Sequence, residues 1–175
     1  MIVTITGGTC SGKTEFAIKC QDFGFDRVIT NTTRNRRSDD KDDSYHFLTI
    51  EQFNKKIDDG DMIEYIEYNG NYYGCSVDSL TDDCVVVLEP NGVRALKEKF
   101  GDKVISVYLK VSEEERLKRG LLRGDKEEII RQRIEEDKVL FNENFEKEVD
   151  IVFIDMEKDD IYNMISTCLL EYLGK

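Results

Sequence analysis

Residues 1–14 read MIVTITGGTCSGKT, and this stretch decides the fold. Residues 2–6 form a short run rich in β-branched side chains, which predicts a buried strand, and residues 13–22 predict a helix. The glycine-rich segment between them matches the pattern G-x-x-x-x-G-K-[ST] at Gly7, Gly12, Lys13 and Thr14. A strand, a glycine-rich loop and a helix in this order predict a phosphate-binding loop of the P-loop type.

The predicted loop has the chemistry to hold the phosphates of ATP. Glycine lets the backbone wrap closely around an anion, with its N–H groups pointing inward. We expect Lys13 to reach the β- and γ-phosphates and the Thr14 hydroxyl to hold Mg²⁺. The residues expected to bind the ATP phosphates are Gly7, Gly8, Thr9, Cys10, Ser11, Gly12, Lys13 and Thr14. The loop alone leaves phosphoryl transfer, GTPase switching and ATP-driven mechanical work open.

Downstream of the loop, buried strands alternate with helices. Continuous apolar runs such as C-V-V-V-L at residues 84–88 are typical of strands that are buried on both faces. Strands are predicted at residues 25–30, 84–88, 104–109 and 151–154, and helices at residues 91–100, 127–145 and 161–173. Ser112 followed by Glu115 forms a capping box that starts a further, charged helix. This alternation predicts an α/β fold, with a mainly parallel sheet flanked by helices.

Residues 32–80 break the alternation. Residues 62–68 read MIEYIEY, the period of a half-buried strand, and the following Asn69-Gly70-Asn71 is typical of a hairpin turn. A short strand at 45–48 and a short helix at 51–57 precede them. We therefore expect a small antiparallel insert within a single domain that covers residues 1–175.

Composition limits the classes of partner. The chain has 175 residues and a formal net charge of −12, which argues against nucleic acid and anionic membranes as partners. It contains no apolar run that approaches the roughly 20 residues of a membrane span, and no basic region precedes an apolar stretch at its start. Five cysteines without a C-x-x-C pair and a single histidine argue against zinc and a disulfide framework. We expect a cytoplasmic protein with free thiols.

Arginines are concentrated in two segments of this acidic chain. They are Arg34, Arg36 and Arg37 in the first segment, and Arg116, Arg119, Arg123, Arg131 and Arg133 in the second. Arginine grips phosphate with a planar fork of donors, so each segment is a candidate anion site. Ordinary surface salt bridges with the many acidic residues are the alternative explanation.

The order of the remaining motifs resembles the guanylate kinase family. The motifs that carry the resemblance are T-N-T-T-R-N-R-R at 30–37, Y-H-F at 45–47, I-E-Y at 63–65 and G-N-Y-Y-G at 70–74. L-K-R-G-L-L-R-G at 117–124 resembles the lid of that family, and V-D-I-V-F-I-D at 149–155 resembles its last strand and adenine-side loop. The resemblance covers nearly the whole chain, and it implies a P-loop kinase with a nucleotide-binding insert and a helical lid at about 113–133.

The resemblance also implies roles for residues of the acceptor site. Arg34, Arg37, Tyr45 and Tyr73 match positions that bind the GMP phosphate. Glu64 matches the carboxylate that accepts guanine N1–H and the 2-amino group. The remaining positions implied for GMP are Thr30, Cys75, Ser76 and Glu89, the last also near the water shell of the metal. Cys75 stands where the family usually has a hydroxyl, and a thiol is a weak donor.

Three arginines, with Lys13, match catalytic positions of the family. They are Arg119 and Arg123 in the lid and Arg133 on the following helix. The reaction implied is ATP + GMP → ADP + GDP with Mg²⁺, and dGMP is a second candidate acceptor. The implied partners are small nucleotides, and the chain would be a monomer or a homodimer.

Two other functions remain open at this point. A related kinase that acts on another nucleotide or on a sugar phosphate would keep Lys13 and Arg34 but would not need Glu64. A catalytically silent binding module on the same fold is the other alternative, although the intact loop argues against it. A GTPase switch is disfavoured because the sequence lacks the N-K-x-D guanine motif.

Overall fold

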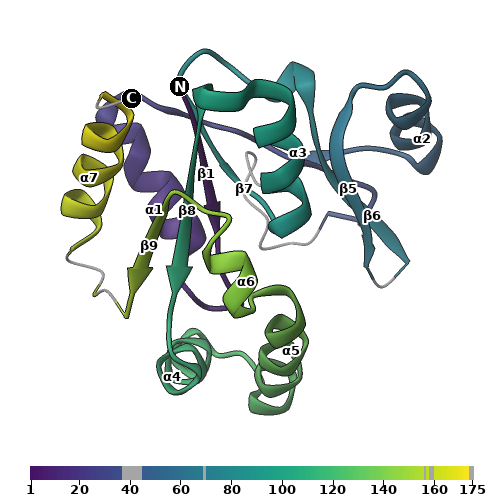
Figure 1. Ribbon diagram of the computed structural model, residues 1–175. Helices are drawn as coiled ribbons and strands as arrows, with labels where there is room; N and C mark the ends of the chain where they lie inside the picture. Colours follow the sequence, from purple (N-terminus) through teal and green to yellow (C-terminus); the bar gives the residue numbers. More distant parts are fainter. Residues whose placement is uncertain (37–44, 69, 156, 158–159, 174–175) are drawn as a thin grey trace.

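A parallel sheet forms the centre of the molecule (Figure 1). The computed structural model describes residues 1–36, 45–68, 70–155, 157 and 160–173. The strands, in sheet order β2-β7-β1-β8-β9, are β2 (Asp26–Arg27), β7 (Cys84–Val87), β1 (Ile2–Thr6), β8 (Val104–Lys110) and β9 (Ile151–Ile154). All four pairings are parallel, which confirms the predicted α/β class.

Helices cover both faces of this sheet (Figure 1). Helices α1 (Lys13–Cys20) and α7 (Ile161–Leu173) lie on one face, and α3 (Pro90–Phe100) lies on the other. Alternate side chains of β1 divide between the two: Val3 and Ile5 pack with Phe16, whereas Ile2 packs with Leu96. Because both faces are buried, every residue of β1 is apolar or a buried threonine.

A second sheet carries the insert. Its strands, in order β4-β3-β6-β5, are β4 (His46–Phe47), β3 (Asn31–Thr32), β6 (Asn71–Ser76) and β5 (Met62–Tyr68), and α2 (Ile50–Asp58) packs beside it. The hairpin β5–β6 is antiparallel, as its alternation predicted. β4 runs parallel to β3, so the insert is mixed instead of purely antiparallel. The connection between these strands is long enough for the crossover that a parallel pair requires.

Two predicted elements differ from the structure. The strand expected at 25–30 is reduced to β2, because the chain leaves the first sheet after Val28 and enters the second at β3. The helix expected at 127–145 is divided into α5 (Glu127–Leu140) and α6 (Glu143–Glu146). The Asn142 side chain accepts hydrogen bonds from the N–H groups of Asn144 and Phe145, which starts a new helix. The break brings Phe141 into a stack on Tyr108, with ring centroids 5.5 Å apart.

Helix α4 (Glu113–Arg123) and helix α5 lie beyond the carboxyl ends of the parallel strands (Figure 1). Ser112 Oγ accepts the N–H of Glu115 and so caps α4 as predicted. Short 3₁₀ turns occupy Gln21–Phe23 (η1), Val77–Ser79 (η2) and Gly101–Lys103 (η3). Across the residues that the structure describes, none of the helices is both long and apolar enough to cross a bilayer.

Candidate active site

The glycine-rich loop turns sharply between β1 and α1. Gly7, Cys10 and Gly12 have positive φ angles of 152°, 60° and 100°. A Cβ atom on Gly7 would lie 2.7 Å from the carbonyl oxygen of Leu109, so only glycine fits there. The α1 helix therefore begins at the loop, and its N-terminal N–H groups face the same space.

Lys13 lies across the loop that precedes it. Its Nζ donates to the carbonyl oxygens of Gly7, at 2.6 Å, and Gly8, at 2.8 Å. Burial lowers the pKa of Lys13, and the nearby carboxylates of Glu89 and Asp137 oppose that shift. Thr14 is exposed in the first turn of α1. The predicted lysine and hydroxyl are thus both at the loop.

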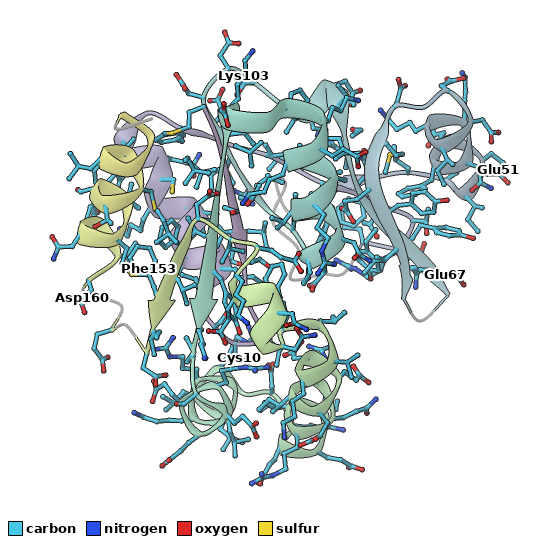
Figure 2. All side chains as sticks on the ribbon, viewed as in Figure 1. Cys10, Glu51, Glu67, Lys103, Phe153 and Asp160 are labelled. Atoms are coloured by element: carbon cyan, nitrogen blue, oxygen red, sulfur yellow. The ribbon has the colours of Figure 1, made fainter. Side chains whose placement is uncertain are left out.

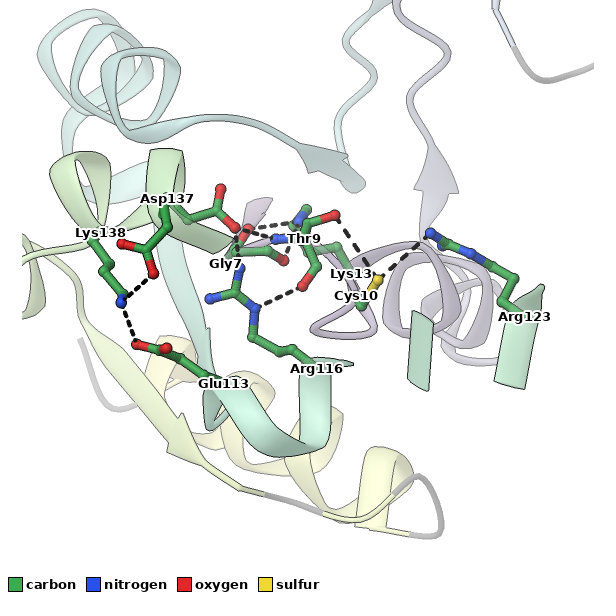
Figure 3. A network of polar contacts seen from close by, with 11 residues as sticks. Gly7, Thr9, Cys10, Lys13, Glu113, Arg116, Arg123, Asp137 and Lys138 are labelled. Atoms are coloured by element: carbon green, nitrogen blue, oxygen red, sulfur yellow. Dashed lines mark hydrogen bonds and ion pairs between the residues drawn. The ribbon is translucent and has the colours of Figure 1, made fainter. Parts of the chain in front are cut away.

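Two of the three predicted lid arginines contact the loop. Arg119 donates to the carbonyl oxygen of Ser11, at 3.3 Å. Arg123 Nη2 lies 3.5 Å from Cys10 Sγ (Figure 3), at the carboxyl end of the sheet where Figure 2 places Cys10. Arg133 is half-buried on α5. Helix α4 is therefore packed against the glycine-rich loop through two of its arginines.

A pocket opens beside the loop, and its empty space of about 370 Å³ includes part of the open solvent. The residues that line it include Ser11 and Arg119, together with Leu109 and Phe153 near the ends of β8 and β9. The segment at 149–155, for which the resemblance implied the last strand and the adenine-side loop, contains β9. A flat, partly apolar base could stack in this pocket while its phosphates enter the loop.

Glu64 lies on β5, facing α3. Its Oε1 accepts the main-chain N–H of Cys75, at 3.2 Å, across the hairpin. A Cβ atom on Gly92 would lie 2.7 Å from Glu64 Cγ, so the first turn of α3 packs directly on this side chain. Burial raises the pKa of Glu64 to about 7; the Cys75 N–H opposes the shift, and the Glu89 carboxylate adds to it.

The predicted phosphate-binding side chains gather on the second sheet. The Arg34 guanidinium lies 5.5 Å from the ring of Tyr45 and 5.5 Å from that of Phe47. The ring centroids of Tyr45 and Tyr73 are 6.0 Å apart. The structure thus brings together Arg34, Tyr45 and Tyr73, from three neighbouring segments, whereas Arg37 lies outside the described residues.

Cys75 and Ser76 are buried, and Thr30, which directly precedes β3, is half-buried. The Cys75 thiol packs in the apolar cluster under α3 and lies 3.8 Å from the carbonyl oxygen of Ser76. The Ser76 hydroxyl is held by Asn31 Nδ2, at 3.0 Å, and by Ser79 Oγ, at 2.9 Å. These contacts lie along β6, and the main-chain N–H of Cys75 also donates to Glu64. Direct contact of these side chains with a base stays a prediction.

Comparison with known proteins agrees with this geometry. The family model described as guanylate kinase matches residues 4–172. The chain belongs to the guanylate kinase family. It is 33% identical over 143 residues to the guanylate kinase of Prochlorococcus marinus, a match that covers 76% of this chain and 78% of that protein. It is 30% identical over 154 residues to that of Chlorobaculum tepidum, which covers 83% and 78%.

A solved structure shows the same fold. The crystal structure of guanylate kinase from Anaplasma phagocytophilum superposes with a TM-score of 0.69 at 22% identity, covering 97% of this chain and 84% of that one. The family is one of nucleoside monophosphate kinases, so the chain is an enzyme of that class. The parallel sheet flanked by helices accordingly matches the fold of a guanylate kinase.

Glu89 is the residue that the resemblance placed near the water shell of the predicted Mg²⁺. It precedes α3 at the carboxyl end of β7; burial raises its pKa, and Lys13 opposes that shift. Its Oε2 is buried and, among the described residues, has no hydrogen-bond partner. A buried carboxylate oxygen and the Thr14 hydroxyl are hard oxygen donors that suit Mg²⁺. The described residues contain no cluster of three metal-ligating side chains.

The sequence did not reveal two residues at the loop. Arg116 stood out only as one of five clustered arginines, and nothing in the sequence distinguished Asp137. In the structure the Arg116 guanidinium and the Asp137 carboxylate form an ion pair, and both contact Thr9 (Figure 3). Their proximity depends on how α4 and α5 pack together, which a single sequence does not show.

Proposed function

We propose that this protein transfers the γ-phosphoryl group of ATP to GMP, with dGMP as a second acceptor and Mg²⁺ as the metal. In this proposal residues 1–175 form one cytoplasmic kinase domain, a monomer or a homodimer. Residues 32–80 are its acceptor-binding part and residues 113–133 its lid. Its partners are small nucleotides.

The observation that carries the proposal is the closeness of Glu64 and Glu89 at the start of α3: the first turn of this helix packs on Glu64 at Gly92, and Glu89 directly precedes the helix. Glu64 interacts electrostatically with Glu89, and Glu89 interacts with Lys13. Glu64, whose carboxylate could bind the guanine edge, therefore lies within electrostatic range of Glu89. Glu89 in turn lies within electrostatic range of Lys13. This is the arrangement that a donor and an acceptor nucleotide need to meet end to end.

Glu64 supports guanine over other bases. Guanine presents N1–H and its 2-amino group on one edge, and a single ionised carboxylate can accept hydrogen bonds from both. Adenine presents an acceptor at N1 and no 2-amino donor. Arg34, Arg37, Tyr45 and Tyr73 would hold the acceptor phosphate, because fork donors and hydroxyls suit a dianion.

Phosphoryl transfer needs alignment and charge neutralisation more than covalent help from the protein. Lys13 would hold the β- and γ-phosphates, while Arg119, Arg123 and Arg133 would neutralise charge on the transferred group. The attacking oxygen of GMP is already anionic, so no dedicated base is required. Mg²⁺, when bound near Thr14 and Glu89, supplies further neutralisation of the donor phosphates.

A coupled assay of ADP release tests the proposal, with ATP, Mg²⁺ and one acceptor at a time. The acceptors are GMP, dGMP, AMP, UMP, CMP and ribose bisphosphate. Turnover confined to GMP and dGMP is expected. Turnover with a different acceptor would leave a kinase but remove the guanine assignment, and silence with every acceptor would favour a binding module.

A further inference from the structure

We propose that Arg116 and Asp137 are positioning residues that hold the phosphate loop in its ATP-binding shape and couple it to the two lid helices. The proposal rests on the proposed function in one respect, which is that the ligand of the loop is ATP. Both residues act through the main chain of Thr9, the third residue of the loop.

The Thr9 residue is held through both of its main-chain polar groups (Figure 3). Arg116 Nε donates to the Thr9 carbonyl oxygen, at 2.7 Å, and the Thr9 N–H donates to Asp137 Oδ2, at 2.7 Å. The ion pair between Arg116 and Asp137 closes the ring of contacts. Arg116 comes from α4 and Asp137 from α5, so a shift of either helix would pull on the loop.

The arginine also fixes the loop by direct packing. A Cβ atom on Gly8 would lie 2.4 Å from Arg116 Cζ, so the guanidinium lies directly on the loop backbone. The side chains of Arg116 and Asp137 are 9% and 16% exposed. A buried ion pair is costly unless its remaining polar atoms are hydrogen-bonded, and two apolar side chains could pack these helices as well. The ion pair forms hydrogen bonds with the main chain of Thr9, whereas an apolar pair would leave these main-chain groups without a partner.

The charges around the pair favour a positioning role over competition with phosphate. Asp137 lies within electrostatic range of Lys13 and Glu89, and alone it would repel an anionic ligand. Arg116, which also lies within range of Lys13, offsets that charge. The pair therefore adds little net charge to the loop while it adds two directional contacts.

Equilibrium titration with a fluorescent ATP derivative tests the inference on the full chain. Arg116→Met and Asp137→Ala should each weaken binding roughly tenfold, since each removes a buried charged hydrogen bond to Thr9. The double variant Arg116→Met/Asp137→Leu should also bind roughly tenfold more weakly, not a hundredfold, because both side chains act on one residue. Asp137→Asn keeps an oxygen acceptor for the Thr9 N–H and should stay within about threefold of wild type.

Lys138→Met is the matched control. Lys138 Nζ lies 3.2 Å from Glu113 Oε1 and joins the same two helices without touching the loop (Figure 3). This variant should bind ATP within about twofold of wild type. The double variant carries no unpaired buried charge, so it keeps the test valid if a single variant fails to fold. Thermal unfolding identifies the variants that are folded.

The KM values separate positioning from a general loss of structure. In folded variants KM for ATP should rise while KM for GMP stays within about twofold. Any of four results would overturn the inference. They are wild-type ATP affinity in the double variant, tighter ATP binding in Asp137→Ala, a hundredfold loss of ATP affinity in the double variant, and equal rises in the KM values for ATP and GMP. If wild type binds ATP but does not phosphorylate GMP, the proposed acceptor fails while the affinity series still decides the role of the pair.

Discussion

Glu64 should make GMP binding depend on pH near neutrality. Burial, partly offset by the Cys75 N–H, gives Glu64 a pKa of about 7 in place of its ordinary 4.5. Only the ionised carboxylate can accept from both donors of the guanine edge. With this pKa, roughly 90% of Glu64 is ionised at pH 8 and roughly 10% at pH 6. The apparent affinity for GMP should therefore fall about tenfold over this range.

The assay is KM for GMP at saturating ATP, measured from pH 6 to pH 8 for wild type and for Glu64→Gln. The glutamine can accept one hydrogen bond and does not titrate, so its KM at pH 8 should be about 10- to 100-fold above that of wild type. Protonation of the GMP phosphate, with a pKa of about 6, affects both proteins alike. The ratio of the two KM values should thus shrink about tenfold at pH 6. A ratio that is constant with pH would refute this account of Glu64.

The same pKa predicts an effect on stability. An acid whose pKa is raised by folding binds its proton more tightly in the folded state, so stability falls as pH rises from about 4.5 to about 7. The shift corresponds to about 3 kcal/mol above that range. Glu64→Gln should therefore unfold at a higher temperature than wild type at pH 8, and at nearly the same temperature at pH 4. Equal melting temperatures at pH 8 would contradict the burial of a charge here.

Three further predictions concern the loop. Lys13→Met should lower kcat by about 10²–10³-fold in the ADP-release assay, and retention of a tenth of the activity would rule out its role. Gly8→Ala should destabilise the protein by about 1–3 kcal/mol in chemical denaturation, because the new methyl group meets Arg116; unchanged stability would count against that packing. Cys10 is the only cysteine that is not buried, so iodoacetamide should label it first and stop turnover, and ATP should slow the labelling. Full activity after stoichiometric labelling would contradict the placement of Cys10 at the ATP site.

Strong local patterns explain why much of the fold could be predicted. The strand, loop and helix at residues 2–20 and the strand Met62–Tyr68 match their expected positions, because each has an apolar period or a glycine pattern that its neighbours do not interrupt. The helix expected at 127–145 is wrong at Asn142. From the sequence alone, an asparagine can lie inside a polar helix. Only the packing of Phe141 on Tyr108 shows why helix α5 ends before Asn142.

The site could be predicted less completely than the fold. Lys13 and Glu64 lie in motifs whose residues are close in sequence, so their proximity to the loop and the hairpin follows from local structure. The contacts of Arg116 and Asp137 join residues that are more than a hundred positions from Thr9, and no periodicity reports such contacts. The burial of Cys75 depends on α3 covering the second sheet, which is likewise a tertiary effect.

The central place of β1 has a consequence for how the chain folds. β1 pairs with β7 and β8, whose first residues lie roughly 80 and 100 positions later, so its two hydrogen-bonding edges are completed only by distant segments. During synthesis β1 leaves the ribosome before both of its neighbours and gains the second only after β8 has emerged. Until then an apolar strand with open edges is exposed, and such a strand can associate with other chains. We therefore expect slow folding, and yields of refolded protein that fall as the protein concentration rises.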